Sequence, residues 1–435
     1  MENSDNAPRP NYFHKIMLTF FGMASLLGWN ALLTELDFFN NYLSDINPYR
    51  SFSFLNYALN ITFQFILVFK KDFLPHKLQL FAGIIGSIAF LVLIPLSTMF
   101  LGRNEMINKI VTGGLIVLMG FTNAICCSGF FSFAGHFPLN MIVIFTAGQG
   151  ISGIGLNVLQ YIVLASVNIN DKDTEYIVRA WIFFGISIVI LLLCLFLVIH
   201  SYNDDYCKYY LNKSNEIENI SKQPETKLLS NFDGETAEEE QGIQAEQVEN
   251  LASGKKEIKP NPSFMYVFKK LWDLDVLACY AYIITFSLFP NVCTSQFIFE
   301  LGIYNSITII SIYNAFDTIG RYLVDKMPKT KRLNLGIGIG RTLLIATLIL
   351  NYYFQFKDVN LTFTSIFLII NVAILGLTNG MAGTLSFGLA SELSEDEIKG
   401  QAGGSISFFS ILGIFFGSCL AFGTGGIIDA IGKTK

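Results

Sequence analysis

Charged residues are scarce in this chain. Asp, Glu, Lys and Arg together make up 14% of its 435 residues, whereas hydrophobic residues make up 52% and the mean hydropathy is +0.49. A soluble globule of this length needs more polar residues to cover its surface. The shortage of charge therefore excludes a soluble fold and predicts a membrane protein.

The sequence also lacks the residue patterns of enzymes and metal sites. Its four His and seven Cys form no CxxC motif and no Cys/His cluster with the spacing of metal ligands. No Ser/His/Asp or Cys/His set emerges, and no carboxylate pair falls within one apolar run. We therefore expect free thiols, no metal, no cofactor and no enzymatic activity. Basic patches are missing as well, so we expect no nucleic-acid partner.

What the chain has in abundance is apolar runs of about 20 residues, the length of an α-helix that crosses a hydrocarbon layer about 30 Å thick. Six such runs precede a polar central stretch and five follow it. The expected fold is an all-α polytopic membrane protein with about eleven transmembrane helices in a 6+5 arrangement. The expected spans lie near residues 16–39, 52–70, 78–101, 109–132, 141–168, 177–200, 273–294, 303–325, 332–353, 361–387 and 402–423.

The polar central stretch, residues 201–263, divides the chain. It is rich in Glu, Gln, Lys, Asn and Ser and nearly free of large apolar residues after Leu229. Such a composition cannot build a core, so we expect a disordered linker. The expected order is an N-terminal segment (1–15), a six-helix bundle (16–200), this linker (201–263), a five-helix bundle (264–423) and a tail (424–435).

The three most basic connections fall on one side of the expected membrane. These connections hold Arg9 and Lys15, then Lys70, Lys71 and Lys77, and then Lys326, Lys329, Lys331 and Arg332. Because basic loops face the cytoplasm, the N-terminus and the linker are expected inside and the C-terminal tail outside. The first apolar run is long enough to span and is interpreted as a helix, not as a cleaved signal peptide. We expect a monomer in the plasma membrane, with an intracellular membrane as the alternative.

Three polar residues interrupt the apolar run from Ile307 to Lys326. Asn314, Asp317 and Arg321 stand about one helical turn apart and therefore form one polar stripe. A charge at the centre of a membrane helix costs roughly 2.5–3.5 kcal/mol, so such residues usually face a protein interior or a watered cavity. The stripe indicates a binding site. Two other interpretations stay open: the Asp and Arg pair within the helix for structural reasons, or the Arg side chain extends to the membrane interface.

The first apolar run carries Trp29 and Asn30 near its middle. In a cavity, the indole offers a flat face for a ring and the amide offers hydrogen bonds, although a Trp that only packs against its neighbours fits the pattern too. Glu35 and Asp37 follow two to three turns later, either in a vestibule or simply at the helix end.

Small residues gather in three places, at 147–155, at Gly376, Gly380 and Gly383, and at 402–404. We interpret them as sites of close helix packing. Pro290 is expected to bend the seventh span. Arg341 is a further charge in an apolar run, interpreted as a latch to the loops or as a second substrate contact.

The sequence resembles the equilibrative nucleoside transporter family at five places, which together cover nearly all of the expected membrane portion. They are Gly28-Trp29-Asn30, similar to the family's Pro-Trp-Asn; Ala134-Gly135 with Pro138, Gly148-Gln149-Gly150 and Gly153; Phe289-Pro290 with Val292; Asn314, Phe316-Asp317 and Gly320-Arg321; and Asn379-Gly380 with Ala402-Gly403 and Phe408-Phe409.

The resemblance implies a fold related to the major facilitator superfamily. It also implies alternating-access transport of nucleosides or nucleobases, with purines favoured and no other ion needed for downhill flux. On the family's pattern, Trp29 contacts the base, Asp317 and Arg321 bind the ribose or hold the site in shape, and Asn30 and Asn314 lie nearby.

The chain departs from the family at two site-related positions. Cys127 stands where the family commonly has a Gln that hydrogen-bonds the base, and a thiol is a weaker partner than an amide. Ala346 stands where the family has a Pro. Cys127 is the last of the expected substrate-binding residues. Because it differs from the family's Gln, a second interpretation stays open, a carrier of another small polar metabolite. The further alternatives are a proton-coupled nucleoside carrier and a membrane receptor or scaffold that recruits partners through residues 201–263.

Overall fold

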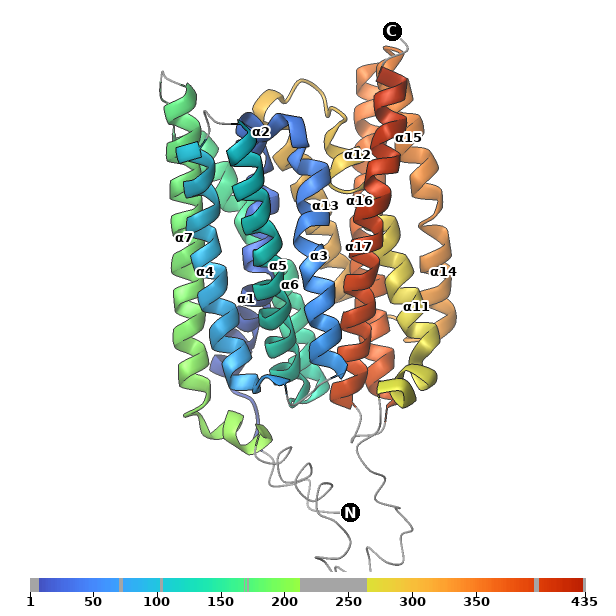
Figure 1. Cartoon of the computed structure of the whole chain (residues 1–435). Helices are drawn as coiled ribbons and strands as arrows, with labels where there is room; N and C mark the ends of the chain where they lie inside the picture. The colour runs from blue at the N-terminus through green and yellow to red at the C-terminus, as the bar shows by residue number, and fades with distance from the viewer. Residues whose placement is uncertain are drawn as a thin grey trace, which may run out of the picture.

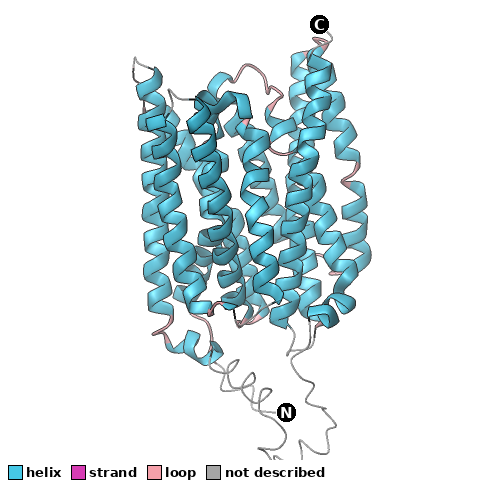
Figure 2. Ribbon diagram, in the orientation of Figure 1, coloured by secondary structure: helices cyan, strands magenta, loops and turns pink. Residues whose placement is uncertain are grey.

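The computed structural model describes residues 8–69, 73–101, 105–167, 169, 172–211, 264–394 and 399–432. Every regular element in these ranges is a helix (Figure 2). The prediction of an all-α fold is therefore confirmed. Most of the predicted linker, residues 212–263, lies outside the described part of the chain.

The N-terminal half contains six long helices, each at or close to a predicted span. They are α1 (Tyr12–Thr34), α3 (Pro48–Phe69), α4 (His76–Leu101), α5 (Glu105–Gly135), α6 (Leu139–Ser166) and α7 (Lys172–Ser201). The short helix α2 (Leu36–Leu43) follows α1 after an interruption at Glu35.

The C-terminal half contains two long helices that are interrupted and three that are continuous. Its elements are α11 (Phe264–Leu288), α12 (Asn291–Thr294), α13 (Asn305–Leu323), α14 (Lys331–Gly340), α15 (Leu343–Phe356), α16 (Leu361–Leu393) and α17 (Lys399–Gly432). The sequence predicts a bend at Pro290, and the structure has an interruption there, since α11 ends before Pro290 and α12 begins after it. A second break, between α14 and α15, falls at Arg341.

Nine helical segments among the described residues are long and apolar enough to cross a membrane. The helices α3 and α13 run alongside them (Figure 1) but are not among the nine. In α13 the polar stripe lowers the hydropathy, although its three polar side chains line an internal cavity and not lipid. The count of eleven spans stays a prediction.

The surface of the bundle is apolar where lipid is expected. On α7, Ile186, Val189, Leu193 and Phe196 recur at helical spacing and are all well exposed. A soluble helix would place charged residues on such a face. This pattern supports a membrane environment for the bundle.

Two predicted boundaries differ from the structure. Helix α17 continues to Gly432, beyond the expected end of the last span at residue 423, and Ile428 is buried against the core. Residues 205–211, assigned to the linker, are also helical. There Tyr206 stacks on His14 at 4.2 Å between ring centroids, and Cys207 is buried. Packing against residues distant in the sequence extends the order at both places.

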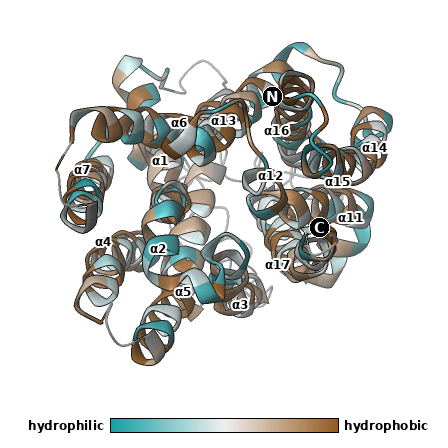
Figure 3. Cartoon of the chain, turned by 90° about the horizontal axis from the view of Figure 1, so that it is seen from above, coloured by the Kyte–Doolittle hydropathy of each residue, from teal (hydrophilic) through white to brown (hydrophobic). Residues whose placement is uncertain are grey.

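The two halves lie side by side, as the view along the bundle shows (Figure 3). Helix α13 packs against α6, and α17 packs against α3, so these four helices form most of the contact between the halves. Helix α1 begins and α17 ends at opposite ends of the bundle (Figure 1). We call the end that carries α2 and Gly432 the distal end.

Candidate functional site

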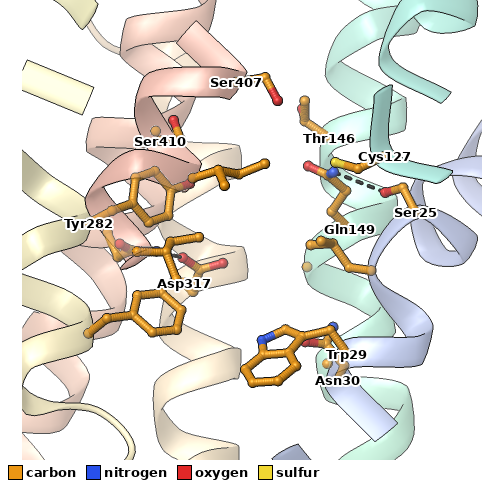
Figure 4. A pocket seen from close by; sticks show the side chains of 18 of the residues that line it. Ser25, Trp29, Asn30, Cys127, Thr146, Gln149, Tyr282, Asp317, Ser407 and Ser410 are labelled. Atoms are coloured by element: carbon orange, nitrogen blue, oxygen red, sulfur yellow. Dashed lines mark hydrogen bonds between the residues drawn. The ribbon is translucent and has the colours of Figure 1, made fainter. Parts of the chain in front are cut away.

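A cavity lies between the two halves (Figure 4). It collects every residue that the sequence analysis assigned to the site. Helices α1 and α5 contribute Trp29, Asn30 and Cys127, and α13 contributes Asn314, Asp317 and Arg321. Residues almost 300 positions apart are therefore brought together at one place. Because a cavity between two bundles is the usual location of a carrier's substrate site, this is the candidate site.

Asp317 is held from two directions. The Nε of Arg321, one turn along α13, donates to its Oδ2 at 2.8 Å, and the Nδ2 of Asn379 on α16 donates to its Oδ1 at 2.7 Å. Only 7% of Asp317 is exposed. The sequence left two interpretations of Asp317 open, a structural ion pair and a cavity site. Both hold, because the carboxylate pairs with Arg321 and also lines the cavity.

A second layer supports this arrangement from behind. Asn379 accepts a hydrogen bond from the hydroxyl of Thr285 at 2.8 Å, and Thr285 in turn contacts the guanidinium of Arg341. Arg341 also donates to Thr378 at 2.8 Å and to the carbonyl of Leu375 at 3.3 Å.

Arg341 therefore joins helices α11 and α16 from the break between α14 and α15. It is buried, 2% exposed, and it does not line the central cavity. Its interpretation as a latch to the loops is wrong, since its hydrogen bonds go to helices inside the bundle. Its guanidinium positions Asn379, and through it Asp317, from behind the cavity wall.

Glycines bring the helices close enough for these contacts. A Cβ at Gly380 or Gly376 would collide with the backbone of α13, at Asp317 and Tyr313 respectively. The predicted close packing is therefore confirmed at these two positions. It is wrong at Gly155 and Gly403, where a Cβ would meet nothing within 4 Å.

The N-terminal wall of the cavity is neutral. The indole of Trp29 packs edge-on against Tyr57, with 5.3 Å between ring centroids. The Nδ2 of Asn30 donates to the hydroxyl of Ser152 at 2.8 Å, which ties α1 to α6. Cys127 is buried at the cavity wall with its thiol free of any disulfide.

Gln149 is a site residue that the sequence analysis overlooked. It lies near Cys127 and Ser25 in the cavity wall (Figure 4), and its Nε2 donates to the Ser25 hydroxyl at 3.0 Å. Its Oε1 accepts from Nη1 of Arg321 at 3.5 Å, a long contact between the two halves. The signal was present in the sequence, because an amide inside an apolar run is also costly to bury, although less so than the charges of the polar stripe on α13.

Comparisons with known proteins agree with this geometry. A family model described as Nucleoside transporter matches residues 114–424, well over half of the chain. The chain belongs to the nucleoside transporter family. Among its relatives, mouse equilibrative nucleoside transporter 2 is 24% identical, over 96% of this chain and 98% of its own. Equilibrative nucleotide transporter 7 of Arabidopsis thaliana is 23% identical, over 93% of each chain.

Solved structures show the fold of this nucleoside transporter family member. It is similar to the major facilitator superfamily proton:xylose symporter XylE, with a TM-score of 0.61 and 14% identity over 97% of this chain and 94% of the other. A second D-xylose-proton symporter structure gives a TM-score of 0.58 at 12% identity, over 97% of this chain and 96% of the other. The expectation of a major-facilitator-like bundle is confirmed.

Proposed function

We propose that this chain carries nucleosides and nucleobases, with purines favoured, across the membrane by alternating access and down their gradient. The observation that carries the proposal is the central cavity between the halves, with an ion pair on one wall and an aromatic ring on the other. Membership of the nucleoside transporter family supports the substrate class.

The two walls suit the two parts of a nucleoside. The ribose hydroxyls donate to the carboxylate of Asp317 and accept from the guanidinium of Arg321, since a charged pair offers both kinds of partner side by side. The base stacks on Trp29, whose flat apolar face accepts any purine or pyrimidine ring. The amides of Asn30, Asn314 and Gln149, all in the cavity lining, are available to the polar edge of the base.

The size of the cavity supports movement of the halves. Its volume is about 150 Å³, the size of an engineered cavity that holds one benzene-sized ring. A complete nucleoside is larger than that. In our proposal the halves therefore part to admit the substrate and close around it, as alternating access requires.

A competition panel tests the proposal. In proteoliposomes that contain the purified protein, unlabelled adenosine, inosine and adenine are expected to reduce uptake of labelled adenosine. If none of the three competes, or if no adenosine enters, the nucleoside assignment fails and a carrier of another polar metabolite takes its place.

The driving force needs a separate measurement. Uptake is expected to persist when the pH gradient is collapsed, because downhill flux needs no coupled ion. Uptake that stops without the gradient would establish the proton-coupled alternative instead.

The proposed orientation places the distal end outside the cell and the N-terminus and linker in the cytoplasm. The protein is proposed to reside in the plasma membrane as a monomer. An epitope tag after Lys435 should bind antibody on intact cells, whereas a tag before Met1 should bind only after permeabilisation. The reverse result would invert the orientation, and a signal confined to permeabilised cells for both tags would favour an intracellular membrane.

A further inference from the structure

A second cavity lies at the distal end and shares no lining residue with the central one. Glu35 and Asp37 line it from the α1–α2 junction, Gln160 from α6 and Arg179 from α7. The C-terminal half contributes Ser306 and its neighbours at the start of α13. Residues of both halves therefore line this cavity. The interactions described at the substrate site do not account for it.

Glu35 is the unusual residue of this distal cavity. Only 3% of it is exposed, and its Oε1 has no hydrogen-bond partner among the residues that the structure describes. Gln160 lies beside this carboxyl group, is 6% exposed, and also has an Oε1 without a partner. Gln160 hydrogen-bonds to the Glu35 carboxyl group through its side chain, but the described residues offer no donor to either Oε1 atom. Two buried acceptors without a donor are costly in free energy.

Arg179 offsets the charge of Glu35 only in part, because it has other partners. Arg179 forms an ion pair with Glu175 on its own helix, and it donates to the backbone carbonyls of Val167 at 2.7 Å and Leu164 at 3.2 Å. Asp37 carries a further carboxylate next to Glu35 and accepts a hydrogen bond from Tyr49. Tyr176 of α7 is the remaining titratable group in the lining.

Two carboxylates, of Glu35 and Asp37, thus line the distal cavity together with the guanidinium of Arg179, whose ion-pair partner Glu175 is not in the lining. A proton on Glu35 resolves both problems at once. It removes a buried charge that faces the like charge of Asp37, and the new O–H group donates to the free oxygen of Gln160. A metal cation such as Ca²⁺ fits less well, because it takes about six to eight oxygen ligands, and the described residues contain no group of three or more His, Cys, Asp or Glu that could hold a metal ion.

The same cavity adjoins the contacts that hold the distal ends of the halves together. The hydroxyl of Tyr49, which donates to Asp37, lies 3.3 Å from the hydroxyl of Ser306 on α13. Nearby, Tyr161 of α6 bonds to Thr308 of α13 at 2.8 Å. An ionised Glu35 repels Asp37 and draws in water to hydrate its charge, which weakens these contacts between the halves.

We propose that Glu35 is a proton-binding site, and that loss of its proton opens the distal end of the bundle. This inference rests on the proposed carrier function in one respect: the opening is taken to admit the substrate. The proton itself binds whether or not a nucleoside is present. The prediction can therefore be tested on the purified protein without a transport assay.

The test uses a cysteine placed at Ile307. This residue lines the distal cavity and is 2% exposed, so a thiol there reacts with a maleimide only when the end opens. Ile303→Cys, on the neighbouring turn and 54% exposed, reports how the thiol's own reactivity changes with pH. The unsubstituted chain gives the background from the native cysteines.

The expected result is a ratio of labelling rates. Between about pH 6 and about pH 9, labelling of Ile307→Cys should rise several-fold more than labelling of Ile303→Cys. Adding Glu35→Gln, which mimics the protonated carboxyl, should abolish this excess. Adding Gln160→Leu should move the rise to higher pH, because the ionised carboxyl group loses the hydrogen bond from Gln160 that stabilises it; this variant serves as the second test where Glu35→Gln does not fold.

Equal labelling curves with and without Glu35→Gln would overturn the inference, as would a flat ratio in the chain that retains Glu35. Either outcome leaves nucleoside uptake by the wild-type protein unaffected. Conversely, a protein that carries no nucleoside but shows the pH-dependent opening would refute the proposed function and keep the proton site.

Discussion

The two walls of the central cavity are built on different principles. The C-terminal wall carries the charges, and each is fixed: Asp317 is bound by Arg321 and Asn379, which are themselves supported by other side chains. The N-terminal wall carries Trp29 and Cys127, which are neutral and held mainly by packing. Removing the partner of a buried charge costs several kcal/mol, whereas a change in the shape of a packed ring costs less. Substitutions should therefore abolish transport on one wall and tune it on the other.

The largest effect is expected for Asp317→Asn. The substitution leaves Arg321 as an unpaired buried charge, a loss of about 3–5 kcal/mol, which corresponds to at least about a hundredfold. Labelled adenosine uptake, divided by the amount of protein inserted in the membrane, should fall to background. Unchanged uptake per inserted molecule would show that the polar stripe is purely structural.

Asn379→Ala should have the next largest effect. It removes one of the two donors to Asp317, which costs about 2 kcal/mol or about thirtyfold in uptake efficiency. Asn371→Ala is the matched control, because Asn371 is also buried on α16 but bonds to Thr347 and does not line the cavity. Similar losses of uptake in both variants would reduce Asn379 to a general packing role.

Sequence periodicity alone was enough to find the charged wall. Asp317 and Arg321 stand out because they interrupt an apolar run, and the turn length of a helix puts them on one face. The spans and the division into two bundles follow from hydropathy in the same way. The same logic would have identified Gln149, had its glycine neighbours not drawn attention to packing.

Other features depend on contacts that no local pattern contains. The support of Asp317 by Asn379 requires α16 to cross α13 at Gly380, and hydropathy does not say which helices become neighbours. The distal cavity is a similar case. Glu35 is brought beside Gln160 by the packing of α1 against α6, so the sequence left open whether Glu35 lies in a vestibule or simply at a helix end.

On the neutral wall, Trp29→Phe should weaken substrate binding without abolishing it. A smaller ring retains part of the stacking, so we expect a loss of about 1 kcal/mol, or about fivefold in the KM for adenosine. Initial uptake rates over a range of adenosine concentrations measure it. A complete loss of transport would mean that this wall is as strict as the charged one.

Cys127 should give the smallest change in overall rate and the clearest change in selectivity. Cys127→Ala removes a weak partner and should leave adenosine uptake within about twofold. Cys127→Gln supplies a side-chain amide and should change the ranking of adenosine, inosine and adenine in the competition panel. An unchanged ranking would place this position away from the base.

The comparison between the walls leads to one structural measurement. A cryo-EM map of the reconstituted protein with adenosine bound should show the base against the indole of Trp29 and the ribose hydroxyls within hydrogen-bond distance of Asp317 and Arg321. Adenosine density elsewhere, with Asp317 still enclosed by Asn379 and Arg321 and out of contact with the ligand, would contradict the account.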